Sequence, residues 1–108
     1  MLLRRSPLAL LGALLAFALA PSSASAITEC GKSGFARNIT TSGVSCSTAR
    51  SFTRAYGVSP ACQEDTRCQL RGYSCRNRLI SRSGSRGTID ARCTRGSKVI
   101  RFQWTIGL

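Results

Sequence analysis

Six cysteines between residues 30 and 93 constrain the fold of this 108-residue chain more than any other feature. They are Cys30, Cys46, Cys62, Cys68, Cys75 and Cys93. Their number is even, the chain has no histidine, and no two of them have the Cys-x-x-Cys spacing of common zinc sites. We therefore predict three disulfides, no metal ion and no cofactor. Disulfides persist in oxidising compartments and stabilise domains with a small hydrophobic core, so this pattern indicates an exported protein.

The N-terminal segment has the order of a secretory signal peptide. Two arginines precede an apolar run over residues 8–20, and an Ala-Ser-Ala cleavage site follows. The apolar run is shorter than the roughly 20 residues that a transmembrane helix needs. We therefore predict that residues 1–26 are a signal peptide, that residues 27–108 form a single small secreted domain, and that this domain is extracellular.

Basic residues dominate the predicted domain. Two of the chain's 16 basic residues lie in residues 1–26, so residues 27–108 keep 14 of them against all four acidic residues, a net charge of +10. Arginine outnumbers lysine there by twelve to two, and guanidinium groups bind carboxylates, sulfates and phosphates in a bidentate manner. This charge indicates a partner such as an anionic polymer, a cell-wall component or an anionic lipid, without specific recognition of nucleic acid. The alternative is that the arginines only keep the protein soluble.

One helix is predicted in the domain. Ser45 is a suitable N-cap, and the apolar residues Ala49, Phe52 and Tyr56 recur at helical spacing. Gly57 is expected to end the helix in a left-handed conformation. The apolar stripe of this helix must cover another element, and the only candidate is a sheet.

Residues 72–104 predict three short antiparallel strands. A turn centred on Gly84 places Cys75 opposite Cys93, and the alternation of side chains then separates an apolar face from a basic one. The predicted core face holds Tyr73, Cys75, Leu79, Ile89, Ala91, Cys93, Ile100, Phe102 and Trp104. The opposite face holds Arg76, Arg78, Arg92 and Arg101, and these four residues, with Arg82 and Arg86, are the predicted anion-binding residues.

Two cross-strand pairs follow from this register. Asp90 falls opposite Arg78, which predicts an ion pair between them. Arg76 falls opposite Arg92, and like charges in that position destabilise a sheet. Either the register is shifted by one residue, or this face is kept basic for a partner.

The rest of the domain is predicted to be mostly irregular. Residues 27–44 indicate a loop and one short strand, and residues 58–71 indicate a polar excursion that a Cys62–Cys68 disulfide would close. The predicted fold is therefore a small α+β domain, with one helix packed on a three- to four-stranded antiparallel sheet and stabilised by disulfides.

Four motifs resemble those of small secreted cysteine-containing domains of high-GC Gram-positive bacteria. They are Ser45-Cys46-Ser47-Thr48-Ala49-Arg50, Gly72-Tyr73-Ser74-Cys75, Cys93-Thr94-Arg95-Gly96 and Val99-Ile100-Arg101-Phe102. The resemblance implies export, a small α+β domain and disulfides, and it implies no activity. It also makes Cys62 and Cys68 an addition to four core cysteines, which agrees with a bond between these two.

The connectivity of the four core cysteines stays open at this point. The hairpin register favours Cys75 with Cys93, which leaves Cys30 with Cys46. A bond from Cys46 to either strand cysteine would instead lock the helix to the sheet.

The sequence predicts a monomeric, non-enzymatic, basic protein that binds anionic surfaces or polymers. No catalytic residue is proposed, because no nucleophile has a visible base and the cysteines are expected to be oxidised. Two alternatives remain. One is a cationic antimicrobial or toxin-like protein, and the other is a small protease inhibitor that uses the loop between Cys62 and Cys68 as bait.

Overall fold

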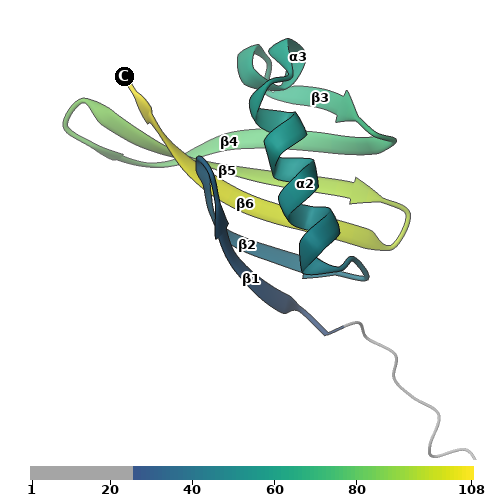
Figure 1. The fold of residues 1–108 in the computed structure, drawn as a ribbon. Helices are drawn as coiled ribbons and strands as arrows, with labels where there is room; N and C mark the ends of the chain where they lie inside the picture. The colour runs from purple at the N-terminus through teal and green to yellow at the C-terminus, as the bar shows by residue number, and fades with distance from the viewer. Residues whose placement is uncertain (1–25) are drawn as a thin grey trace, which may run out of the picture.

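The computed structural model describes residues 26–108, in which one antiparallel sheet carries a helix on one face (Figure 1). The predicted signal peptide, except its last residue, lies outside the described residues. The elements are β1 (Thr28–Ser33), β2 (Ala36–Ser42), α2 (Cys46–Gly57), α3 (Pro60–Glu64), β3 (Arg67–Leu70), β4 (Tyr73–Ser83), β5 (Arg86–Arg95) and β6 (Lys98–Gly107). Neither helix in residues 26–108 has the length and apolar character needed to cross a bilayer.

The small α+β architecture predicted from the sequence is confirmed, but the expected three to four strands and single helix fall short of the observed elements. The sheet has six strands, in the order β1-β2-β6-β5-β4-β3, and a second short helix is present. Strand β1 escaped prediction because register shifts around Gly31 break its alternation. Helix α3 has five residues and strand β3 has four, so neither is long enough to show a clear period.

Strand β6 lies in the middle of the sheet although it comes last in the sequence. It pairs with β2 on one side and with β5 on the other (Figure 1). Its inward residues Ile100, Phe102 and Trp104 are buried, as the alternation predicts. The central position protects both edges of an apolar strand, which would otherwise invite pairing with another chain.

Helix α2 begins as the sequence predicts and ends for a different reason. The Ser45 hydroxyl accepts a hydrogen bond from the Thr48 N–H at 3.1 Å. Gly57 does not have the left-handed conformation expected of it, and Val58 is the C-cap, with a φ of −110°. A Cβ atom at Gly57 would lie 2.7 Å from Cε1 of Phe35. The absence of a side chain at Gly57 therefore leaves room for Phe35, which belongs to the β1–β2 turn, to pack against the end of α2.

An aromatic cluster joins α2 to the sheet. The ring of Phe52 lies 4.9 Å from that of Tyr73, and the ring of Tyr56 lies 4.9 Å from that of Phe102 and 5.5 Å from that of Trp104. These five residues are buried. Such ring pairs contribute beyond the area they bury, so this cluster is the centre of the core.

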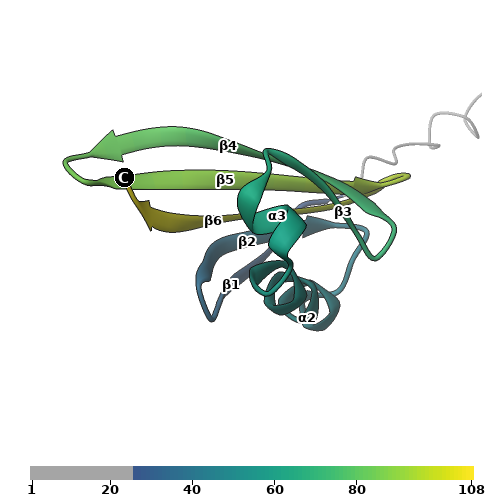
Figure 2. The same ribbon diagram turned by 90° about the horizontal axis from the view of Figure 1, so that it is seen from above.

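Two residues that the sequence assigned to the core face are not part of the core. Leu79 is 43% exposed, and Ile89 is only partly buried. The alternation was right, because Leu79 and Ile89 are paired in register as expected. Helix α2 crosses the strands, and the long hairpin of β4 and β5 extends past the side of the helix (Figures 1 and 2), so no helix covers its outer end.

Three disulfides connect neighbouring elements. They are Cys30–Cys46 between β1 and α2, Cys62–Cys68 between α3 and β3, and Cys75–Cys93 between β4 and β5. Of the connectivities left open by the sequence, the structure has the one that follows the hairpin register. The helix is thus bonded to an edge strand, while aromatic packing holds it to the centre of the sheet.

A polar contact fixes both helices to β4. The Tyr56 hydroxyl donates to Oδ1 of Asn77, whose Nδ2 donates to the carbonyl oxygens of Cys62 and Asp65, each at 3.0 Å. Burial raises the pKa of Tyr56 to about 12, and the hydrogen bond with Asn77 offsets part of that rise. Asn77 therefore joins α2, α3 and the residue that follows α3 to β4, and its N–H also donates to the Thr66 carbonyl just before β3.

Candidate anion-binding site

The antiparallel register aligns four arginines across four neighbouring strands. Arg67 on β3 is opposite Arg76 on β4, Arg76 is opposite Arg92 on β5, and Arg92 is opposite Arg101 on β6. We call these four residues the arginine row. Neighbouring strands lie about 4.8 Å apart, so the row spans about 14 Å. The alternation places it on the face of the sheet that α2 leaves open.

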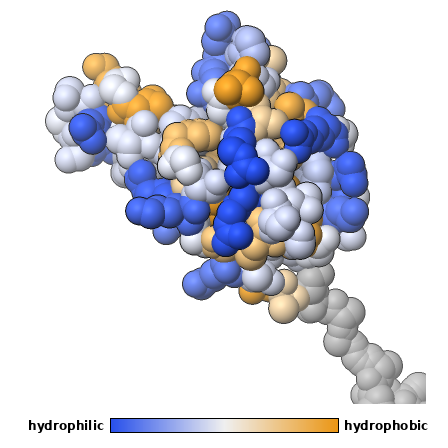
Figure 3. All heavy atoms as spheres, viewed as in Figure 1, coloured by the Kyte–Doolittle hydropathy of each residue, from blue (hydrophilic) through white to orange (hydrophobic). Residues whose placement is uncertain are grey.

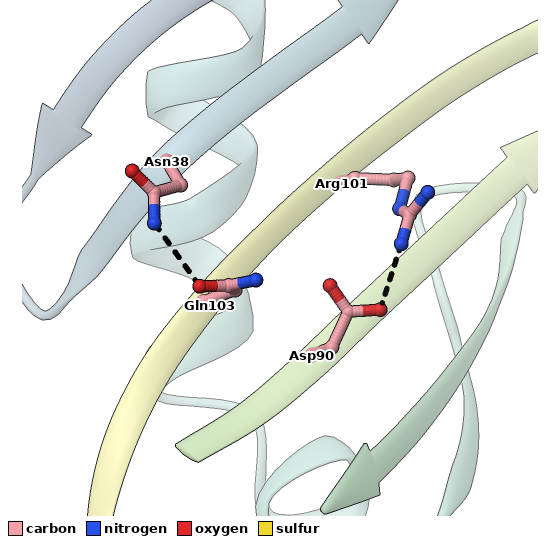
Figure 4. Close-up of polar contacts among 4 residues, drawn as sticks. All are labelled: Asn38, Asp90, Arg101 and Gln103. Carbon is pink, nitrogen blue, oxygen red and sulfur yellow. Dashed lines mark hydrogen bonds and ion pairs between the residues drawn. The ribbon is translucent and has the colours of Figure 1, made fainter. Parts of the chain in front are cut away.

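The arginine row lies in an open hollow of about 670 Å³ on this face. Arg78 and Asp90 line the hollow two residues away from the row on β4 and β5. The polar residues Gln69, Ser74 and Thr94 line it on the other side. We call the row and Arg78 together the arginine face. Figure 4 shows part of this surface, with α2 behind the sheet. Five guanidinium groups thus share the hollow with one carboxylate.

The one carboxylate forms the one ion pair found within residues 26–108. Oδ2 of Asp90 lies 3.1 Å from Nη2 of Arg101 (Figure 4). The sequence predicted Arg78 as the partner, and that prediction is wrong although Arg78 does lie opposite Asp90. Arg101 is the diagonal neighbour on β6, and a long side chain can reach that position.

The other four arginines of the arginine face have no carboxylate within 4.0 Å among the described residues. All five arginines of the arginine face are exposed. Like charges directly opposite one another destabilise a sheet, and the row contains three such pairs. The Arg76 and Arg92 juxtaposition expected from the sequence is thus real, and it belongs to a longer series. Within this series only Arg101 has a carboxylate partner among the described residues, so the repulsion between the other arginines is not offset by an ion pair.

The structure brings together only some of the arginines predicted to bind anions. Arg76, Arg78, Arg92 and Arg101 line the hollow, as expected. Arg82 and Arg86 belong to the outer end of the β4–β5 hairpin and do not line it.

Arg67 was missed because residues 58–71 were interpreted as a polar excursion. A signal for β3 exists in the sequence, since Arg71 and Gly72 form a two-residue connection between alternating segments. Both have positive φ, 52° and 82°, as a type I′ hairpin turn requires. Arginine rarely adopts this conformation, so the turn did not stand out.

Hydrogen-bonded polar residues flank the arginine row. Nε2 of Gln69 donates to Oγ of Ser74 at 3.1 Å on one side. Nδ2 of Asn38 donates to Oε1 of Gln103 at 3.0 Å on the other (Figure 4). These amides and hydroxyls offer further donors and acceptors to a ligand that extends beyond the guanidinium groups.

A second basic hollow of about 260 Å³ lies near the start of α2, but protein contacts occupy its arginines. Nη1 of Arg71 donates to Oγ of Ser51, and Nη1 of Arg95 donates to the Arg71 carbonyl, both at 3.2 Å. The Arg95 guanidinium also lies 5.0 Å from the centre of the Tyr73 ring. These side chains support the fold, so we do not assign a ligand to this hollow.

The described residues offer no alternative chemistry with comparable geometry. No group of three or more Cys, Asp or Glu side chains within residues 26–108 could hold a metal ion. All six cysteines are in disulfides. The fold and the arginine face define a small, disulfide-stabilised α+β domain with a cationic open sheet.

No family model, no curated protein and no solved structure matches this chain. The resemblance to small secreted domains of high-GC Gram-positive bacteria therefore stays a prediction.

Proposed function

We propose that this protein is secreted and binds anionic polymers or surfaces outside the cell through the arginine face. The observation that carries the proposal is the alignment of four arginines across four strands, with one carboxylate in the hollow they share. The three disulfides fit an oxidising compartment, where such polymers are encountered.

The geometry suits an extended ligand. A linear polyanion that crosses the strands can place successive anionic groups on successive arginines, because the row is one residue wide and four strands long. Each guanidinium offers a planar fork that matches phosphate, sulfate or carboxylate. Linked anionic groups bind with a high effective concentration once the first is held, so weak single contacts add up to useful affinity.

Sequence-specific recognition of nucleic acid is not part of the proposal. Every aromatic residue from 26 to 108 belongs to the cluster on the α2 side or its margin, which leaves no ring on the arginine face for stacking on bases. Binding through arginines alone reads charge and spacing. Heparin and DNA are therefore suitable probes for the same surface.

The test is a salt titration of binding to heparin and to DNA. If the five arginines each contact one phosphate, the logarithm of the DNA association constant should fall against the logarithm of salt concentration with a slope of about −4 to −5. Changing Arg76 and Arg92 to glutamine should make the slope shallower by about 2 and weaken binding.

A matched control removes two positive charges elsewhere. A stripe of hydrophilic side chains crosses the α2 side of the molecule (Figure 3), and Arg50 and Arg54 are exposed residues of α2. The double change R50Q/R54Q lowers net charge equally but leaves the arginine face intact. Equal loss of affinity in both double variants would show that net charge alone drives binding, and the proposed site would be wrong.

The protease-inhibitor alternative has no comparable support. The segment between Cys62 and Cys68, proposed as bait, begins in helix α3, and the Cys62 side chain is buried. Its carbonyl groups at Cys62 and Asp65 accept hydrogen bonds from Asn77. An extended exposed loop that a protease could engage as a strand is therefore missing at this place.

A further inference from the structure

The outer end of the β4–β5 hairpin carries apolar side chains that no element covers. Leu79 is 43% exposed, and Ile80 is 42% exposed. Ile89 and Ile106, on the neighbouring strands β5 and β6, are only partly buried. Apolar residues also show at this end of the molecule in Figure 3, which views the α2 side.

These side chains share one face of the sheet. A Cβ atom added to Gly87 would lie 2.7 Å from Leu79 and 3.3 Å from Leu108, so both leucines cover the Gly87 backbone. Gly87 is in register with Ile106. A β-bulge makes Ile80 an extra residue after Leu79, and its side chain adds to the apolar surface there. We call Leu79, Ile80, Ile89, Ile106 and Leu108 the apolar ledge.

The apolar ledge continues the core face beyond the part of the sheet that α2 crosses. The same face is covered by the helix over Tyr73, Cys75 and Cys93, which are at most 4% exposed. Beyond the helix the hairpin and the paired end of β6 project from the sheet (Figures 1 and 2). Grouped exposed apolar residues on a projecting element are typical of an interaction surface.

Charge around the apolar ledge indicates what it contacts. Residues 79–89 include Arg82 and Arg86 and no acidic residue, and residues 105–108 have no charged side chain. Two copies of such a cationic end would repel each other, which disfavours a dimer through the ledge. An anionic lipid bilayer complements this end in two ways. Its negative headgroups attract the arginines, and its apolar interior can accept the exposed apolar side chains.

We infer that the apolar ledge inserts into the interface of anionic membranes, with Arg82 and Arg86 held at the headgroups. This site is separate from the arginine face and does not require it. It gives the membrane-directed alternative raised by the sequence a specific set of residues. Salt should weaken the headgroup contacts, whereas insertion of the apolar side chains should resist it.

The first test measures partition of the oxidised protein onto vesicles of phosphatidylglycerol and phosphatidylcholine, over a range of salt concentrations. The double change L79S/I80S should weaken partition by about tenfold, since each residue has roughly two fifths of its surface still available for burial. The matched control I27S/V58S removes two exposed apolar side chains outside the hairpin, and it should stay within about twofold of the wild type. Circular dichroism of each variant verifies the fold.

The second test reports insertion directly and keeps the ledge apolar. Trp104 is the chain's only tryptophan, so the double change I80W/W104F moves the fluorophore to the ledge. Its emission should shift to the blue on anionic vesicles and stay shifted when salt is added after binding. On pure phosphatidylcholine vesicles the shift should be much smaller, because the headgroup attraction is missing.

Three results would overturn the inference. The first is unchanged emission together with wild-type partition of L79S/I80S, which would leave the arginine face as the only membrane contact. The second is a dimer of the wild-type protein that L79S/I80S dissociates, which would make a second copy the occupant. The third is equal weakening in L79S/I80S and the control. Heparin binding is read in parallel, so failure of the ledge and failure of the arginine face remain distinguishable.

Discussion

Arg76 provides the sharpest test of whether the arginine row costs stability for the sake of binding. It is opposite Arg67 on one side and Arg92 on the other, so its guanidinium belongs to two like-charge pairs. Cross-strand pairs are worth roughly 0.2–1 kcal/mol each. Changing Arg76 to threonine, which also suits a strand better, should therefore raise the free energy of unfolding by about 1 kcal/mol at low salt.

The assay is thermal unfolding of the oxidised protein at low and high salt. A gain of about 1 kcal/mol corresponds to roughly 4–8 °C in Tm for a domain of this size. The gain should shrink at 1 M salt, where charges are screened within about 3 Å. The same variant should elute from heparin at lower salt than the wild type.

The control changes another arginine of the same strand. Arg82 on β4 is opposite Gly87 and has no arginine in register. R82T should therefore give a much smaller, salt-insensitive change in Tm. The reasoning fails if R76T is less stable than the wild type, or if its gain in stability is equal at low and high salt. Either result would show that repulsion between the arginines of the row does not destabilise the folded state.

Three further predictions concern the core. Changing Tyr56 to phenylalanine should lower the free energy of unfolding by about 1–3 kcal/mol in denaturant titrations, because Oδ1 of Asn77 loses its donor. The pKa of Tyr56 is raised from 10.0 to about 12, so its contribution to wild-type stability should be fully present below pH 10 and be lost as the pH rises through 12, whereas Y56F should lack this decline. Changing Gly57 to alanine should cost about 1–3 kcal/mol by displacing Phe35, whose ring lies where the new Cβ would be. Replacing both cysteines of the disulfide that spans 16 residues should cost about 3 kcal/mol against about 2 kcal/mol for the one that spans six, measured as shifts of the denaturation midpoint.

Patterns within one element were sufficient for the helix and the central hairpin. The 3.6-residue spacing of Ala49, Phe52 and Tyr56 gave the buried stripe of α2, and the Ser45 cap marked its start. A turn centred on Gly84 predicted the observed pairing of Cys75 with Cys93. The turn itself consists of Gly84 and Ser85, and a β-bulge between Leu79 and Ser81 restores that register. These features depend on residues close in sequence, where spacing and turn chemistry act directly.

Only part of the candidate anion-binding site could be predicted from patterns within one element. Arg76, Arg78 and Arg92 could be placed on one face because they belong to a single hairpin. Arg67 joins them through β3, whose four residues are too few for a periodic signal. Asp90 pairs with Arg101 because β6 lies beside β5, and register within the β4–β5 hairpin contains no information about a third strand's side chains.

The sequence alone therefore determined a small, basic, disulfide-stabilised α+β domain, its main helix, and the division of the hairpin into an apolar and an arginine-bearing face. The tertiary structure decided that β6 is central, that β1 and β3 form the edges, and that the arginines align in one row across four strands. It also decided where α2 stops covering the sheet, and hence that the apolar ledge is exposed. The physical reason is that side-chain periodicity is a property of each element, whereas the order of strands and the reach of a helix depend on contacts between residues distant in sequence.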